Sequence, residues 1–258
     1  MHMATNGLNV IKLGGRSVET ESGRAQLAQR IGALRSAGWK LVVVHGGGAQ
    51  VTAALAAAGI EARFVDGLRV TDEKTLEVAE PVFAHVGKTI AHALTQAGAP
   101  AIALTGRDAQ LVRGVVKAAS LGRVGTVTGV DAELLRHLVY NGITPVVGPI
   151  AVDEAGALNV NADEVASAIA RALGAKDLLL LTDVPAVRDG QGKAVPTLTP
   201  EGAQELIRTG AASGGMVPKI HGALEALASG VGRVRVLDEP GLVRLAQGEE
   251  AGTVFVDA

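Results

Sequence analysis

Two lysines that are far apart in the sequence each lie beside a pair of glycines. Lys12 ends a short apolar run and precedes Gly14 and Gly15, and Lys219 ends the glycine-containing segment 213–219. A glycine turn lets backbone N–H groups approach an anion closely, and a helix N-terminus adds partial positive charge. Each lysine adds a full charge. The two segments therefore predict a site for a phosphate chain.

A histidine and three consecutive glycines follow the apolar run 40–44: His45, Gly46, Gly47 and Gly48. Glycine loses more chain entropy on folding than residues with side chains, so packing alone does not explain three in a row. We interpret them as backbone that contacts a bound group. A plain tight turn, which needs one or two glycines, is the alternative. We expect His45 to be a hydrogen-bonded structural residue rather than a base.

Polar side chains alternate just before the helical pattern at 163–173: Asn159, Asn161 and Asp163. Capping of that helix would account for one of them. In an extended segment the three would share one face, where Asp163 could hold nearby lysines and the asparagines could donate to a carboxylate. Arg69, between a glycine and a helix start, could grip a carboxylate with its planar fork or be an ordinary surface arginine.

Composition and motifs exclude several classes of protein. The formal charge of −2 gives no electrostatic case for nucleic acid or an anionic membrane. The absence of cysteine excludes disulfides and thiolate chemistry. Neither a P-loop nor a dinucleotide fingerprint occurs, so phosphates would bind in another manner. No apolar run reaches the roughly 18 residues of a membrane span, and we expect a cytoplasmic protein.

Strands and helices alternate along the 258 residues, which is typical of βαβ units. The interior must be filled by Val, Leu, Ile and Ala, because the chain has only one Trp, one Tyr and three Phe. That composition suits a parallel sheet covered by helices on both faces. We predict an α/β protein: a three-layer αβα sandwich with a central, mostly parallel sheet. The expected strands are 8–13, 40–44, 101–104, 144–147, 177–181 and 232–237, and the expected helices are 23–37, 50–58, 73–97, 131–140, 163–173, 200–208 and 219–229.

Two segments depart from this regular alternation of strands and helices. Residues 110–128 alternate Val with polar residues and glycines, which predicts an antiparallel hairpin on the edge of the main sheet. Pro81 predicts a kink or break in the helix 73–97.

We favour one continuous sheet over two lobes divided near Gly174. Ligands of open parallel sheets bind beyond the carboxyl ends of the strands, where every glycine motif of this chain lies.

Six segments, in their order, resemble the amino acid kinase family, and within it the members that act on N-acetylglutamate. They are 12–15, 45–48, 67–71, 159–163, 181–185 and 213–219. The resemblance covers essentially the whole chain and implies the carbamate kinase-like fold. It implies that ATP phosphorylates the side-chain carboxylate of N-acetyl-L-glutamate to N-acetyl-L-glutamyl 5-phosphate in arginine biosynthesis. Mg²⁺ would be held mainly by the ATP phosphates, with no metal ligands from the protein.

The resemblance also implies roles for single residues. Lys12 and Lys219 would stabilise the transferring phosphoryl group from both sides, and Asp163 would organise the two lysines. Gly47 and Gly48 would offer backbone N–H groups. The acetylated amino acid would be held by Arg69, Asn159 and Asn161. The nucleotide site would be lined by Gly14, Gly15, Asp183, Val184, Pro185, Ala186, Val187, Arg188, Ala211, Ala212 and Ser213.

The same resemblance implies that the two parts of the single domain 1–258 have different functions. Residues 1–174 would bind acetylglutamate and form a homodimer, with the long apolar helix 73–97 packing against its copy. Residues 175–258 would bind ATP.

Phosphoryl transfer to a carboxylate is consistent with these residue types even without the family resemblance. A carboxylate nucleophile is already ionised at neutral pH, so it needs no general base. The difficulty is repulsion between two anions, which positioning and positive charge overcome.

Two alternatives stay open. One is a kinase of the same fold that acts on carrier-protein-linked aminoadipate or glutamate in lysine biosynthesis, for which basic residues around the pocket mouth are expected. The other is a non-catalytic nucleotide-binding protein of this fold. The presence of Lys12, Asp163 and Lys219 speaks against the second alternative.

Overall fold

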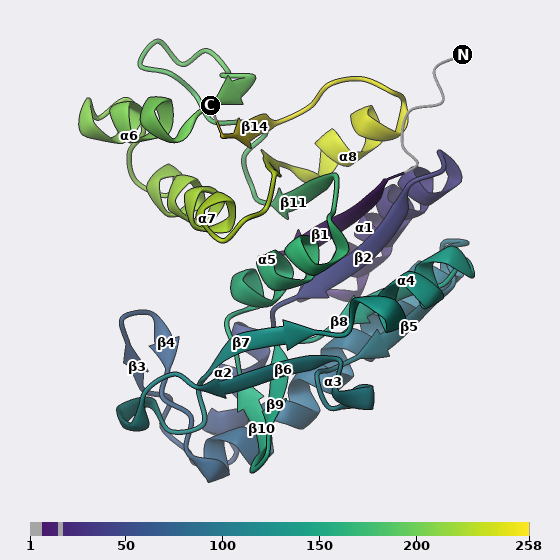
Figure 1. Ribbon diagram of the computed structural model, residues 1–258, viewed down its shortest axis with the longest axis vertical. Helices are drawn as coiled ribbons and strands as arrows, with labels where there is room; N and C mark the ends of the chain where they lie inside the picture. Colours follow the sequence, from purple (N-terminus) through teal and green to yellow (C-terminus); the bar gives the residue numbers. More distant parts are fainter. Residues whose placement is uncertain (1–6, 15–17, 258) are drawn as a thin grey trace.

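A computed structural model describes residues 7–14 and 18–257, and its centre is an eight-stranded sheet (Figure 1). The strands are β1 (Leu8–Leu13), β2 (Lys40–His45), β5 (Ala101–Leu104), β8 (Thr144–Val147), β11 (Asp177–Leu181), β12 (Thr197–Leu198), β13 (Arg233–Leu237) and β14 (Thr253–Val256). Their order across the sheet is β12-β14-β13-β11-β1-β2-β8-β5. Neighbouring strands are parallel except β13 and β14, which are antiparallel.

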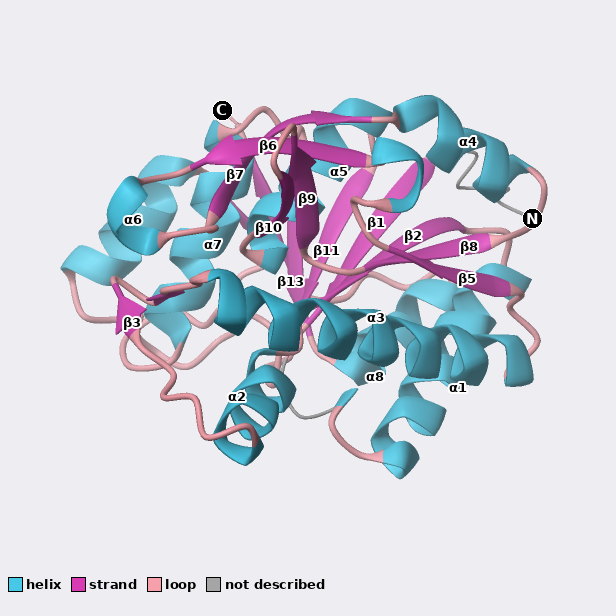
Figure 2. Ribbon diagram, turned by 90° about the horizontal axis from the view of Figure 1, so that it is seen from below, coloured by secondary structure: helices cyan, strands magenta, loops and turns pink. Residues whose placement is uncertain are grey.

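Helices cover both faces of this sheet, which confirms the predicted three-layer αβα sandwich. They are α1 (Glu21–Ser36), α2 (Gly48–Ala57), α3 (Glu73–Gln96), α4 (Ala132–Tyr140), α5 (Ala162–Leu173), α6 (Pro200–Arg208), α7 (Met216–Ala228) and α8 (Glu239–Ala246). Figure 2 shows α1, α3 and α8 below the sheet and α4 and α5 above it.

Alternation along the central strands separates the two largest hydrophobic cores, one on each face of the main sheet. In β1, Val10 packs with α4, α5 and α7 on one face, and the next residue, Ile11, packs with α1, α3 and α8 on the other. Successive strand side chains point to opposite faces, so a strand covered on both sides must be apolar at nearly every position. This is why the central strands read as unbroken runs of Val, Leu and Ile.

The hairpin expected at 110–128 forms, but not on the edge of the main sheet. The strands β6 (Val112–Val116) and β7 (Gly125–Val130) are antiparallel, and they belong to a separate four-stranded sheet with β9 (Ile150–Asp153) and β10 (Gly156–Asn159). After β5 the chain turns through Ala109 and Gln110, both with positive φ. It thereby leaves the plane of the main sheet. The partner strands β9 and β10 were not predicted.

Several other elements differ from the expectation. Helix α3 continues through Pro81, so a break there was wrong. Its apolar face, including Phe83, Ile90 and Leu94, is buried within the chain itself. The short hairpin β3 (Phe64–Val65) and β4 (Leu68–Arg69), and the C-terminal β12, α8 and β14, were not predicted. In the described part of the chain, none of the helices has the length and apolarity that crossing a bilayer requires.

The junction between the two sheets predicts a sharp stability effect at Gly106. Its N–H donates to the Ile150 carbonyl at 2.8 Å. An added Cβ would overlap that oxygen and lie 2.8 Å from the Val112 carbonyl oxygen, and backbone atoms cannot swing aside. We expect Gly106→Ala to lower the free energy of unfolding by about 2–3 kcal/mol, measured by urea denaturation.

Gly222→Ala is the matched control. Gly222 lies inside α7, and a Cβ added there would have nothing within 4 Å. Alanine favours a helix by up to about 1 kcal/mol, so this variant should be as stable as the parent or more so. Equal losses in both variants would contradict the packing argument.

Candidate active site

The carboxyl ends of three adjacent strands bring the sequence motifs to one edge of the sheet. Strand β1 pairs in parallel with β2 on one side and with β11 on the other, and Lys12 lies opposite both Val44 and Leu180. The chain leaves β1 toward β2 through α1, whereas β11 belongs to the later part of the chain. In open α/β sheets, ligands bind at such a switch of strand order.

Lys12 and Lys219 line one cavity of about 670 Å³, together with Gly14 and Asp183. The helix that carries Lys219 was expected to begin at that residue, but α7 begins at Met216. Lys219 therefore projects from the first turn of the helix. The structure thus brings the two lysines to the same space from opposite ends of the sequence.

Each lysine has a carboxylate partner. The Lys12 ammonium lies 2.9 Å from Asp163 Oδ1, and the Lys219 ammonium pairs with Asp183. Asp163 was expected to organise both lysines; among the described contacts it pairs with Lys12, while Asp183 holds Lys219. Asp183 is 74% exposed in its side chain, so water screens its pair with Lys219.

The glycine run 46–48 lines a second cavity of about 210 Å³, shared with Arg69, Asn159 and Asn161. Asn161 precedes the first turn of α5, which carries Asp163. Lys12 of the first cavity pairs with Asp163, two residues after Asn161 of the second cavity, so the ion pair links residues beside the two cavities. One cavity is lined by two ammonium groups, and the other by backbone glycines, an arginine and two side-chain amides.

Arg69 is held in place by its neighbours. Its Nη2 donates to the Gly48 carbonyl and to Thr52 Oγ1, both at 2.9 Å, and its guanidinium lies over the Phe64 ring at 4.7 Å from the centroid. Burial lowers the pKa of Arg69. Its Nη1 is buried and has no hydrogen-bond partner among the described residues. Arg69 lines the cavity, and a guanidinium held in such a wall can pair with a carboxylate.

Two hydrogen bonds in series connect Asn159 to the backbone of Arg69. The Asn159 Nδ2 donates to Thr71 Oγ1 at 2.9 Å, and Thr71 Oγ1 donates to the Arg69 carbonyl at 2.8 Å. The sequence places Thr71 in a motif but predicts no role for it, and it does not single out Thr52 or Phe64. These residues can be recognised only in the folded structure, because each is identified by its contact with Arg69 or Asn159.

The polar segment before α5 is extended only as far as Asn161. Asn159 ends β10, and Asn161 is the N-cap of α5, with Oδ1 accepting from the Asp163 N–H at 2.9 Å. Asp163 lies inside the first helical turn, so the expectation of three residues on one extended face was wrong. The cap turns the chain, and this turn directs Asp163 toward Lys12 rather than alongside the asparagines.

The chain just after the expected nucleotide segment 183–188 approaches the other expected segment, 211–213, at Ala211. A Cβ added at Gly190 would lie 3.6 Å from the Ala211 Cβ. The exposed positions in these loops are Asp183, Pro185, Arg188 and Ser213, and Val184 and Ala211 are half-buried. The side chains of Ala186, Val187 and Ala212 are buried instead. Gly15 lies outside the described residues.

His45 is fully buried at the end of β2, beside the glycine run. Its Nδ1 lies 2.6 Å from the Gly46 carbonyl oxygen, which confirms the expected structural hydrogen bond. Burial lowers the pKa of His45 to about 4, so the ring is neutral at physiological pH.

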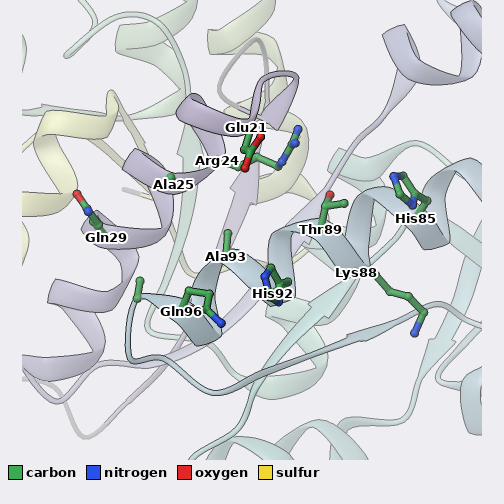
Figure 3. A pocket seen from close by; sticks show the side chains of 11 residues that line it. Glu21, Arg24, Ala25, Gln29, His85, Lys88, Thr89, His92, Ala93 and Gln96 are labelled. Carbon is green, nitrogen blue, oxygen red and sulfur yellow. The ribbon is translucent and has the colours of Figure 1, made fainter.

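Another cavity, of about 520 Å³, lies between α1 and α3 (Figure 3). It is lined by Glu21 and Arg24 of α1 and by His85, Lys88 and His92 of α3, among others. None of the described residues that line it belongs to the six segments that carry the predicted chemistry. The convergence of lysines, glycines and amides therefore distinguishes the strand-end site from this groove.

The sequence profile of the amino acid kinase family matches residues 7–238. This chain belongs to the amino acid kinase family. A relative from Solibacter usitatus (strain Ellin6076), named acetylglutamate kinase, is 44% identical over 254 residues, which are 96% of this chain and 99% of the relative.

Solved structures of other proteins share the fold. That of smu.665 from Streptococcus mutans UA159 has a TM-score of 0.79 at 30% identity and covers 97% of this chain and 99% of its own. Carbamate kinase from Giardia lamblia bound to AMP-PNP has a TM-score of 0.70 at 18% identity and covers 99% of this chain and 100% of its own.

Proposed function

We propose that this amino acid kinase transfers the γ-phosphoryl group of ATP to the side-chain carboxylate of N-acetyl-L-glutamate, a step of arginine biosynthesis. The observation that carries the proposal is the Lys12–Asp163 ion pair, which links a lysine of one cavity to the first turn of α5, next to Asn161 and Ala162 of the other. One cavity offers ammonium groups for phosphates, and the other offers an arginine and amides for a carboxylated substrate. The 44% identity to a relative named acetylglutamate kinase supports the same assignment.

The reaction needs positive charge more than proton transfer. An oxygen of the substrate carboxylate forms a bond to the γ-phosphorus, the bond from that phosphorus to the β–γ bridging oxygen breaks, and ADP leaves. No proton is taken from the nucleophile, which agrees with a neutral, buried His45. Lys12 and Lys219 stabilise the charge on the moving phosphoryl group from its two sides.

The acetylated amino acid occupies the smaller cavity. Its α-carboxylate pairs with the positive charge of the Arg69 guanidinium and with the side-chain amides of Asn159 and Asn161. Gly47 and Gly48 donate backbone N–H groups to the reacting oxygens. The segment 1–174 thus supplies the substrate side.

The segment 175–258 supplies most of the nucleotide side. ATP lies along the loops 183–188 and 211–213, with its phosphates directed toward Lys219 and Lys12. The Lys219–Asp183 pair is weak because it is exposed, so the lysine can exchange this carboxylate for a phosphate at little cost. Like other enzymes that use free metabolites, this kinase is expected in the cytoplasm.

Magnesium is expected to arrive on the nucleotide. The carboxylates that line the lysine cavity are Asp183, Asp238 and Glu239. Asp183 pairs with Lys219 and Glu239 with Arg30, and Asp238 Oδ1 accepts from the Gly241 N–H. In residues 7–14 and 18–257, no group of three or more His, Cys, Asp or Glu side chains is arranged to hold a metal ion. Mg²⁺ bound to the ATP phosphates would neutralise part of their charge.

Replacing Lys219 by alanine tests the phosphoryl-transfer role. We expect kcat to fall by about 100-fold or more, because a charge that acts in the transition state is lost. ATP should still bind, as measured by isothermal titration. Lys176→Ala is the control, since Lys176 is exposed at the opposite end of β11. A Lys219→Ala enzyme within threefold of wild-type turnover would contradict the assignment.

Substrate choice is tested by ADP release in a coupled assay with four acceptors: N-acetylglutamate, glutamate, aspartate and N-acetylaminoadipate. We expect N-acetylglutamate to give the highest kcat/KM. Preference for N-acetylaminoadipate would favour the kinase of lysine biosynthesis instead. ATP binding without ADP release from any acceptor would favour a non-catalytic nucleotide-binding protein.

We also propose a homodimer. The apolar face of α3 is used inside the chain, so a second copy would meet the opposite face of α3 and the open edge of the sheet at β5, where Ile102 is 41% exposed. Light scattering after size exclusion should give twice the mass of 26.1 kDa. Ile102→Lys should yield monomers. Val116→Lys, an equally exposed site on β6, should leave the dimer intact. A monomeric parent protein would overturn this proposal.

A further inference from the structure

The buried ring of His45 is poorly explained by packing. It is 0% exposed, and its Nε2 has no hydrogen-bond partner among the described residues. Burying an unpaired polar atom is unfavourable, and an apolar side chain would fill the same space without that cost. The protein nevertheless makes room for the ring. A Cβ on Gly87 would lie 2.9 Å from Nε2, and a Cβ on Gly148 would lie 3.2 Å from it.

The other ring nitrogen provides the reason for a histidine. Nδ1 lies 2.6 Å from the Gly46 carbonyl oxygen. A carbonyl oxygen can only accept, so Nδ1 carries the proton and donates it. The neutral ring then has its proton on Nδ1 and a bare Nε2. The contact holds the orientation of one peptide group, the one that joins Gly46 to Gly47.

That peptide group belongs to the substrate cavity. The described chain contains no cis peptide bonds, and in a trans peptide the C=O and the following N–H point in opposite directions. With the Gly46 carbonyl directed at the buried ring, the Gly47 N–H is directed away from it. Gly46 and Gly47 both line the cavity. No hydrogen bond in the described part of the chain uses the Gly47 N–H as its donor.

Glycines leave this peptide free to rotate, because neither flanking residue has a Cβ to restrict it. A donor that stabilises developing charge must already be aimed when the reaction occurs. We propose that His45 is a positioning residue: its Nδ1–H holds the Gly46–Gly47 peptide so that the Gly47 N–H faces the reacting oxygens. This inference rests on the proposed phosphoryl transfer and assigns His45 no contact with substrate or proton.

Two substitutions of matched shape separate the hydrogen bond from packing. Asparagine carries an N–H donor on Cγ, as histidine does at Nδ1, and leucine has nearly the same shape without a donor. We expect His45→Leu to lower kcat by about tenfold or more, with KM for N-acetylglutamate and ATP within about threefold. His45→Asn should recover most of that loss. Equal kcat values for the two variants would overturn the proposal.

Gly87 gives an independent test that leaves His45 in place. In Gly87→Ala the new methyl group displaces the ring at Nε2, so kcat should fall as in His45→Leu. Asparagine has no atom at the Nε2 position, so adding Gly87→Ala to His45→Asn should cause no further loss. If Gly87→Ala lowered kcat in the double variant as much as it does alone, its effect would not act through the ring of His45, which would contradict the proposal. Comparing Gly87→Ala with the double variant also tests the proposal if His45→Leu fails to fold.

Crystal structures of the variants make the outcome independent of the reaction assigned. The Gly46–Gly47 peptide should keep its orientation in His45→Asn and rotate, or adopt two orientations, in His45→Leu. An unchanged peptide in His45→Leu would refute the positioning role whatever the substrate is. A wild-type protein that releases no ADP with any acceptor would instead refute the proposed function, while the peptide orientation would still test His45.

Discussion

The parallel pairing of β1 with β2 on one side and β11 on the other determines where the chemistry of this chain can occur. Parallel strands end at the same edge of a sheet, so the loops after all three strands must meet there. The register places Lys12 opposite Val44 and Leu180, which sets His45 and the loop after Leu181 at the same level. Every later contact at the site, from Lys12–Asp163 to Lys219–Asp183, depends on this alignment.

Charge at the site is balanced within the protein but remains exchangeable. Lys12 and Lys219 are each neutralised by one aspartate, and the carboxylate of Asp183 is largely exposed. Exposed ion pairs contribute only about 0–1 kcal/mol, so phosphates that bring several negative oxygens can replace them. The buried polar groups on the substrate side behave differently. Arg69 is held by Gly48, Thr52 and Phe64, so it can pair with a carboxylate without first losing side-chain freedom.

Backbone donors require orientation as well as proximity. The glycine run at 46–48 lets the chain approach a ligand, but the same freedom allows its peptide groups to rotate. A hydrogen bond from the buried His45 to the Gly46 carbonyl supplies the missing restraint. The approach and the restraint thus come from neighbouring residues with opposite physical properties: glycines without a side chain, and a rigid, buried histidine ring.

The sequence by itself determined the layers, the order of the main helices and strands, and the segments that lie at strand ends, because apolar periodicity and glycine turns are local properties. It identified Lys12, Lys219 and Asp163 through a resemblance of ordered motifs. It did not reveal the separate sheet of β6, β7, β9 and β10, since short strands are specified by their partners. Tertiary structure alone decided that Asp183 holds Lys219, that Phe64 and Thr52 hold Arg69, and that the ring of His45 faces Gly46. Those contacts join residues whose separation in the sequence carries no signal, and only the topology of the sheet sets the distances between them.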